Sequence, residues 1–105
     1  MIVITIDREA LSIHAKGHAK GPRNEYGHDL VCAAVSALMQ GYAYAGTRTG
    51  HIMEIMMDKG DMLARVDPDA TVHEELRNIF RGYCLGLQLV AENRPECLRI
   101  TYADK

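Results

Sequence analysis

GHDLVCAAVSALMQ, residues 27–40, is an apolar run that follows an acidic residue and carries a cysteine near its start. The Asp29 carboxylate is suited to cap a helix, because it can accept hydrogen bonds from the backbone N–H groups of Val31 or Cys32 and meets the positive end of the helix dipole. Apolar side chains then recur at helical spacing: Leu30, Val31, Ala34, Val35, Leu38 and Met39. The stretch predicts a buried helix that begins after Asp29 and frays between Gly41 and Gly46.

Two alternating segments precede this helix. Residues 1–6, MIVITI, put Ile2, Ile4 and Ile6 on one side of a strand, and residues 10–17, ALSIHAKG, resume the alternation after a short polar break. Branched apolar residues at every second position are typical of a half-buried strand. We expect the two segments to pair as a hairpin.

The second half of the chain has the same order of elements in a different sequence. Residues 51–66 predict another hairpin with its turn at residues 58–61, and residues 97–102, CLRITY, predict a last strand. Between them, Thr71 and Glu74 match a capping box, and Asn93-Arg94-Pro95 ends the helix that follows. One face of this helix is apolar: Val72, Leu76, Ile79, Phe80, Tyr83, Leu87 and Val90.

The resulting order, ββαββαβ, indicates an α/β (α+β) fold with one mixed, largely antiparallel sheet and two helices packed on it. A length of 105 residues predicts a single domain over residues 1–105. The formal charge of −2 implies no general attraction to nucleic acid or anionic lipid. No apolar run is long enough for a membrane span, and no signal segment is recognisable. Three cysteines at irregular spacing fit a reducing compartment, so we expect a cytoplasmic protein.

Residues 17–28, GHAKGPRNEYGH, have neither helical nor strand periodicity and contain glycine, proline and charged residues. Irregular segments of about this length in a compact domain are usually functional loops. We expect a mobile loop here, whose glycines, Gly17, Gly21 and Gly27, let it fold over an extended peptide and open again.

Cys32, just beyond the end of this loop, admits two interpretations. A cysteine among valines and alanines is usually a packing residue. Cys32 is also about the third residue of the helix, where unpaired N–H groups and the dipole stabilise a thiolate. A thiolate nucleophile needs a base or cationic partner, and His18 stands at the end of a strand between the small residues Gly17 and Ala19.

The block Gly17-His18-Ala19, the glycine-bearing loop and the block from Gly27 to Leu38 closely resemble the ribosomal-processing cysteine protease family known as Prp. The resemblance implies a bacterial α/β protein, typically a homodimer, that removes a short N-terminal extension from a large-subunit ribosomal protein without a cofactor or metal. It also implies that Cys32 is the nucleophile and His18 its base. Thirteen residues separate the two here, where the family pattern leads us to expect about eleven; loop closure tolerates the difference.

The implied chemistry is acyl transfer, in which the Cys32 thiolate attacks a peptide carbonyl and backbone N–H groups stabilise the oxyanion. We expect those donors at the helix start, including the N–H of Cys32 itself. Asp29 can orient His18 as a third member or act as a helix cap alone. Ser36, one turn after Cys32, can bond to the active-site wall or to its own helix.

Two alternatives belong to other classes. His14, His18, His28 and Cys32 can be interpreted as a zinc site, which predicts bound metal. A non-catalytic ribosome-associated domain on the same scaffold predicts an unreactive Cys32. We interpret the other cysteines, Cys84 and Cys97, as packing residues. Core packing is also the expected role of the methionine cluster Met53, Met56, Met57 and Met62, with a dimer interface as the alternative. Gly82 and Gly86 permit close approach of another backbone, within the chain or across a dimer.

Overall fold

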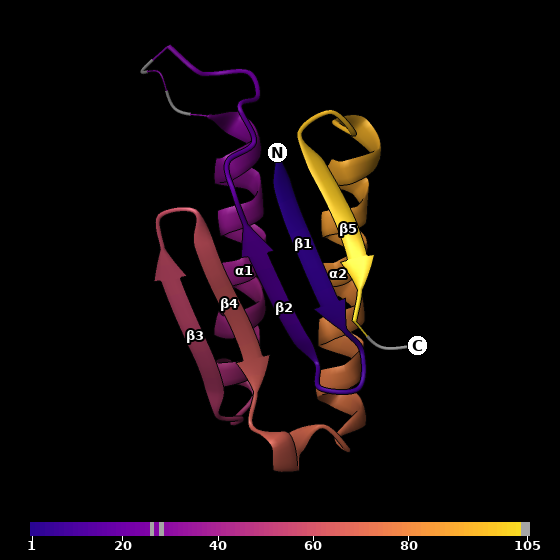
Figure 1. The fold of residues 1–105 in the computed structure, drawn as a ribbon. Coiled ribbons are helices and arrows are strands. Elements are labelled where there is room, and N and C mark those ends of the chain that lie inside the picture. Colours follow the sequence, from indigo (N-terminus) through magenta and orange to yellow (C-terminus); the bar gives the residue numbers. More distant parts are fainter. Residues whose placement is uncertain (26, 28, 104–105) are drawn as a thin grey trace.

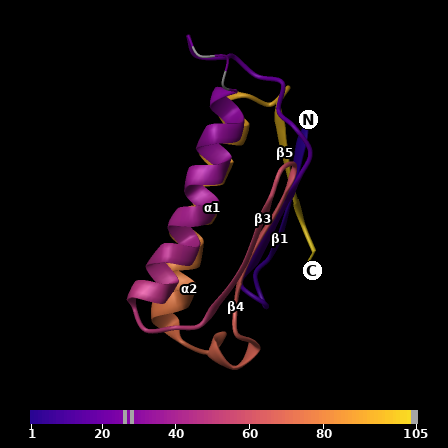
Figure 2. The same ribbon diagram turned by 90° about the vertical axis from the view of Figure 1, so that its left-hand side faces the viewer.

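The computed structural model describes residues 1–25, 27 and 29–103. A five-stranded sheet carries two helices on one face, side by side (Figures 1 and 2). Neither helix of this described chain is long and apolar enough to cross a membrane. The elements in chain order are β1 (Ile2–Asp7), β2 (Ser12–Lys16), α1 (Leu30–Arg48), β3 (Met53–Asp58), β4 (Asp61–Val66), a 3₁₀ turn (Pro68–Ala70), α2 (Glu74–Asn93) and β5 (Leu98–Tyr102).

The strand order in the sheet is β3-β4-β2-β1-β5. β5 pairs with β1 in parallel, with Ile2 opposite Leu98, and every other pairing in the sheet is antiparallel. The predicted fold class, a mixed and largely antiparallel sheet with two packed helices in the order ββαββαβ, is therefore confirmed. β2 lies between β1 and β4, and its last residue, Lys16, is opposite Asp61 at the start of β4.

The core lies between the sheet and the helices. The alternating isoleucines of β1 are buried as predicted, together with Leu11, Ile13 and Ala15 around β2. At the centre, the buried Tyr42 of α1 contacts the ring of Phe80 edge-on, at 5.5 Å between centroids. Its hydroxyl donates to the Leu11 carbonyl at 2.6 Å, and burial raises its pKa. Leu11 has a left-handed backbone, φ 51°, so this hydrogen bond holds a strained residue of the β1–β2 turn.

The predicted fraying of α1 between Gly41 and Gly46 is wrong, because the helix continues through both glycines to Arg48. Each glycine admits a neighbouring side chain. A Cβ at Gly41 would come 2.7 Å from the Tyr83 ring, and one at Gly46 would collide with the Met53 sulfur. Close packing against α2 and β3 thus outweighs the weak helix propensity of glycine.

The predicted capping box of α2 is also wrong. His73 occupies the N-cap position without a side-chain hydrogen bond, and the Thr71 hydroxyl donates to the Pro68 carbonyl in the preceding turn. Val72 therefore lies outside the helix and is 79% exposed. The rest of the predicted face is confirmed, with Leu76, Phe80 and Leu87 buried.

The methionine cluster is only partly a packing feature. Met53 and Met62 pack against the core, whereas Met56 and Met57 on the edge strand β3 are exposed, contrary to the expected core role. Cys97 is buried and Cys84 packs against the core, as predicted. Of the two α2 glycines, Gly86 faces Leu38 of α1 within the same chain, since a Cβ added at Gly86 would come 3.1 Å from Leu38 Cδ2.

Candidate active site

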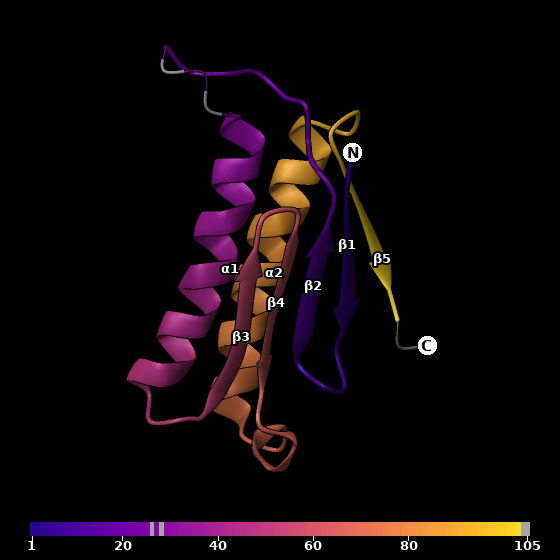
Figure 3. The same cartoon turned by 60° about the vertical axis from the view of Figure 1, so that its left-hand side comes forward.

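Three segments meet at one end of the sheet. The chain leaves β2 after Lys16, passes beyond the end of the sheet and returns to the start of α1, and the β3–β4 turn points toward the same end (Figures 1 and 3). The pairing of Lys16 with Asp61 brings the turn beside the residues that follow β2. The Gly17 N–H donates to the Gly60 carbonyl at 2.9 Å, which ties the two segments together.

The start of α1 is held by Asp29, which caps the helix as predicted. Its Oδ1 accepts from the N–H groups of Val31 and Cys32 at 2.9 and 3.0 Å. Its Oδ2 accepts from the Gly21 N–H at 2.7 Å, so one carboxylate joins the loop to the helix. The pKa of this carboxyl is lowered, and the hydrogen bond from the Cys32 N–H is the largest cause. Partial burial raises the pKa in opposition. The hydrogen bonds from Gly21 and Val31 and the positive charge of Arg23 lower it further.

This anchoring brings the residues after β2 over the start of α1. The Cys32 thiol is half-buried, and its sulfur accepts a hydrogen bond from the Ala19 N–H at 3.4 Å. His18, the neighbour of Ala19, is exposed. No hydrogen bond within the described chain joins the His18 ring to the Cys32 thiol or to Asp29. The two predicted partners thus lie on adjoining segments without direct bonding.

The His18 ring lies against the β3–β4 turn. A Cβ at Gly60 would come 2.8 Å from His18 Nε2 and 3.0 Å from Cε1, and the backbone of Gly60 is left-handed, φ +78°. Gly17 is also left-handed, and a Cβ there would collide with the Met1 carbonyl oxygen. Glycine at position 60 lets the turn approach the imidazole closely, and glycine at position 17 lets the first residue after β2 approach the residue before β1.

A cavity of about 590 Å³ opens between these segments. His18, Cys32, Asp29 and Ser36 all line it, so it brings together the four residues predicted for catalysis and support. The rest of the lining is Ile2, Gly17, Lys20, Arg23, Lys59, Gly60 and Met62. The lining contains four basic side chains and one acidic side chain, so it is predominantly basic. The basic residues are His18, Lys20, Arg23 and Lys59, and the acidic residue is Asp29.

The other predicted site residues have defined positions. Ser36 Oγ accepts from the Gln40 amide at 2.9 Å, one turn along its own helix. Among the loop glycines, Gly21 donates to Asp29 and Gly27 accepts from Arg23. The Cys32 N–H, one of the helix-start groups expected to stabilise the oxyanion, donates to Asp29 Oδ1 at 3.0 Å in this structure.

The histidines of the predicted zinc set diverge. His14 Nε2 contacts Asp61 Oδ1 at 2.6 Å on β4, and His28 lies outside the described residues. Across residues 1–25, 27 and 29–103, no three His, Cys, Asp or Glu side chains are grouped so that they could hold a metal ion.

Sequence reasoning missed Lys59, Gly60 and the Ala19 N–H as parts of this site. Residues 58–61 are recognisable as a turn, but the alternation that predicts a strand does not tell which strand lies beside it. The signal for Gly60 exists only once β4 is known to pair with β2, because that register fixes the turn next to Gly17.

A thiol at a helix start, a nearby imidazole and an open cavity are the parts of a thiol hydrolase, and comparison with known families gives the class, a cysteine protease. The sequence profile of the family described as "Cysteine protease Prp" matches residues 1–99, and the chain belongs to that family. A search of the curated proteins by sequence gives no match.

Solved structures agree with this assignment over nearly the whole chain. An S. aureus structure described as an essential ribosomal processing protease, Prp, with a covalently linked product peptide is 28% identical, with a TM-score of 0.81 and coverage of 97% of this chain and 99% of that chain. The same S. aureus protease with a substrate peptide has a TM-score of 0.78 at the same identity and coverage. The protein SMU.848 of Streptococcus mutans is 26% identical, with a TM-score of 0.75 and coverage of 99% and 93%.

Proposed function

We propose that this protease is a ribosomal-processing endopeptidase, which removes a short N-terminal extension from a precursor of a large-subunit ribosomal protein. The similarity to the S. aureus protease, which binds substrate and product peptides, supports the reaction class. The observation that carries the proposal for this chain is the contact of Cys32 Sγ with the Ala19 N–H, beside His18 in one cavity.

In the proposed mechanism, His18 takes the proton of the Cys32 thiol and the thiolate attacks the scissile carbonyl carbon. The tetrahedral intermediate collapses, the C–N bond breaks, and His18 returns the proton to the leaving amine. Water, activated by the neutral His18, then hydrolyses the thioester and regenerates the thiol. The N–H of Ala19, 3.4 Å from Cys32 Sγ, supports the thiolate before attack.

Asp29 acts in this mechanism as a positioning residue. Its carboxylate is used by three backbone N–H groups, from Gly21, Val31 and Cys32, which supports the capping interpretation over a direct bond to His18. It holds the nucleophile on α1 and the loop in one arrangement. The loop of residues 17–28, through Gly17, Gly21 and Gly27, is proposed to cover the bound peptide.

The proposal also includes the cytoplasm as the site of action, which rests on the cysteine usage, and a homodimer as the active form, which rests on the family resemblance. The ribosomal precursor is a cytoplasmic protein, so enzyme and substrate would meet there. Sedimentation velocity of the full chain measures the assembly state, and a monomer at concentrations that give full activity would contradict the dimer.

Cleavage of the extended ribosomal precursor by the full chain tests the reaction. We expect cleavage by the unaltered protein, and loss of cleavage in Cys32→Ala and His18→Ala. Cys84→Ala and His73→Ala are matched controls, since they remove a thiol and an imidazole outside the cavity. Undiminished cleavage by Cys32→Ala would refute the mechanism. Failure of the unaltered chain to cleave this precursor, with Cys32 still alkylated, would refute the substrate alone.

A further inference from the structure

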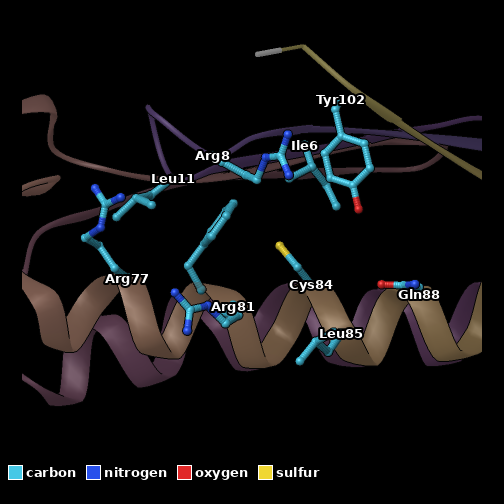
Figure 4. Close-up of a pocket in the computed structure, with 10 residues that line it drawn as sticks. Ile6, Arg8, Leu11, Arg77, Arg81, Cys84, Leu85, Gln88 and Tyr102 are labelled. Atoms are coloured by element: carbon cyan, nitrogen blue, oxygen red, sulfur yellow. The ribbon is translucent and has the colours of Figure 1, made fainter. Parts of the chain in front are cut away.

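A second cavity, of about 300 Å³, lies between α2 and the sheet (Figure 4). It begins where β1 and β5 end, at Ile6 and Tyr102, whereas the candidate active site includes Ile2 at the start of β1. The two cavities share no lining residue. The mechanism above therefore makes no use of this second cavity.

The second cavity is positively charged. Arg8, Arg77 and Arg81 are among its ten lining residues, and none of the ten is Asp or Glu. Arg77 and Arg81 are one turn apart on α2, and both line the cavity; the Arg77 side chain extends toward Leu11, and the Arg81 guanidinium lies beside the helix (Figure 4). In a chain with a formal charge of −2, this is a local reversal of sign.

The guanidinium groups of Arg77 and Arg81 keep donors for a ligand. Arg77 uses one nitrogen to donate to the Thr71 carbonyl, at 3.3 Å, and an arginine has five N–H donors in all. Arg81 makes no hydrogen bond or ion pair with any residue of the described chain. Two such groups on the lining of one cavity can donate to the oxygens of a phosphate or diphosphate.

The remaining wall is apolar and partly flat. Ile6, Leu11 and Phe80 form its buried floor, and Leu85 and Tyr102 are the apolar lining side chains with exposed surface, at 58% and 48%. The Arg8 guanidinium lies 4.6 Å from the centroid of the Tyr102 ring. Burial raises the pKa of the Cys84 thiol to about 12, so this wall carries no negative charge at neutral pH. Gln88, at the far side in Figure 4, supplies an amide that can donate and accept.

We propose that this cavity binds a nucleoside phosphate, with the phosphate oxygens on Arg77 and Arg81 and the base against Tyr102 and the apolar wall. Its volume is at the lower end of the range for small-molecule sites, about 300–1,000 Å³, which suits one mononucleotide. An inorganic anion would leave the apolar wall unused. Single-stranded RNA is bound along grooves with successive aromatic side chains, whereas this cavity has one exposed aromatic ring, Tyr102.

Calorimetric titration of the full chain with ADP, pyrophosphate and adenosine tests the proposal. We expect ADP to bind at least about tenfold more tightly than either fragment, because only ADP uses both halves of the cavity. Arg81→Gln should weaken ADP by about tenfold or more through loss of a charge-assisted contact. Tyr102→Leu should weaken ADP and leave pyrophosphate unchanged. Arg48→Gln, at the far end of α1, is the matched control and should bind ADP normally.

The basal peptide cleavage of Arg81→Gln should equal that of the unaltered protein, since Arg81 lies outside the candidate active site. Absence of ADP binding at millimolar concentration would overturn the proposal. Pyrophosphate binding as tight as ADP would contradict the nucleoside part of the proposal, because the base would then contribute nothing to affinity. A short single-stranded RNA that binds more tightly than ADP, and loses that affinity in Arg81→Gln, would assign the arginines to RNA instead.

Discussion

His18 Nε2 and the Cα of Gly60 are so close that a single added Cβ on Gly60 would come 2.8 Å from the imidazole. The two residues are distant in sequence and meet because β4 pairs with β2. The β3–β4 turn thus packs against one side of the His18 imidazole, and the hydrogen bond from the Gly17 N–H to the Gly60 carbonyl holds this turn beside the end of β2. Substitution at the turn should consequently affect catalysis in addition to folding stability.

Gly60→Ala should lower kcat/KM for peptide cleavage by at least about tenfold, because a displaced base costs catalysis steeply. Gly50→Ala is the matched control. Gly50 is also left-handed, φ +89°, but a Cβ there meets nothing within 4 Å. Both variants should lose about 1–2 kcal/mol of folding stability from the left-handed backbone alone. An equal loss of kcat/KM in both would show that the His18 contact has no catalytic importance.

Asp29→Asn should make the free energy of unfolding depend less on pH in the acidic range. Hydrogen bonds from backbone N–H groups, led by that of Cys32, hold the pKa of Asp29 below its ordinary value in the folded chain. The stability that this depressed pKa contributes is present above the unfolded pKa of about 3.9 and is lost as pH falls through the folded value. Urea unfolding from about pH 6 to pH 2.5 should therefore show a smaller acid loss in the variant than in the unaltered protein.

At neutral pH Asp29→Asn should lower the free energy of unfolding by about 1–2 kcal/mol. The Gly21 N–H donates to Oδ2 in the unaltered protein, and in the variant an amide NH₂, which is also a donor, stands in its place. Asp69→Asn serves as the control, since that carboxylate is exposed on the 3₁₀ turn. Identical acid profiles for the unaltered protein and Asp29→Asn would contradict the coupling of charge to the cap.

The three thiols should differ in alkylation. Cys32 lies on a cavity wall, Cys97 is 3% exposed, and burial raises the pKa of Cys84 to about 12. Iodoacetamide at neutral pH should modify Cys32 first, because only thiolates react. Peptide mass spectrometry over time measures the order. Modification of Cys84 as fast as Cys32 would contradict the environments described for both.

Tyr42→Phe should lower the free energy of unfolding by about 1–3 kcal/mol, because it removes the 2.6 Å hydrogen bond to Leu11 and leaves a buried carbonyl unpaired. Tyr44→Phe, at a position 67% exposed, should have no measurable effect. Burial raises the pKa of Tyr42, so its contribution is present below the unfolded value of about 10 and is lost as pH rises further. Alkaline destabilisation in urea titrations should be weaker in Tyr42→Phe.

Replacing glycine by alanine should have opposite effects on stability in the two helices. Gly82→Ala should stabilise the protein by about 0.5–1 kcal/mol, since it raises helix propensity at an exposed position where a Cβ meets nothing within 4 Å. Gly41→Ala should destabilise it, because its Cβ would come 2.7 Å from the Tyr83 ring. Thermal unfolding of both variants measures the difference. Stabilisation by Gly41→Ala would show that Tyr83 moves aside without cost.

The sequence predicts most of the fold, because its signals are local. Alternation at Ile2, Ile4 and Ile6 is a property of neighbouring residues, and so is the cap at Asp29, which the structure confirms through hydrogen bonds to Val31 and Cys32. The errors arise where a tertiary contact overrides a local preference. Glycine is typical of helix ends, yet Gly41 and Gly46 lie inside α1, where the lack of a side chain lets Tyr83 and Met53 pack against the helix backbone.

The candidate site is predictable in its chemistry and not in its geometry. A cysteine at a helix start and a histidine between small residues can be identified from the residues alone, and the cavity contains both. Gly60 cannot be assigned to the site from sequence, because the partner of β4 in the sheet depends on packing across the whole molecule. The second cavity escapes sequence reasoning for the same reason, since Arg8 and Arg81 meet only through the fold.

The parallel pairing of β1 with β5 has a consequence during synthesis of the chain. β1 emerges from the ribosome long before β5, and the Ile2 N–H donates to the Cys97 carbonyl at the start of this pair. A nascent chain therefore carries an isoleucine-rich strand with one open edge until β5 has been translated. An unpaired edge is a template for association between chains, so interrupted translation products should aggregate where the finished chain does not.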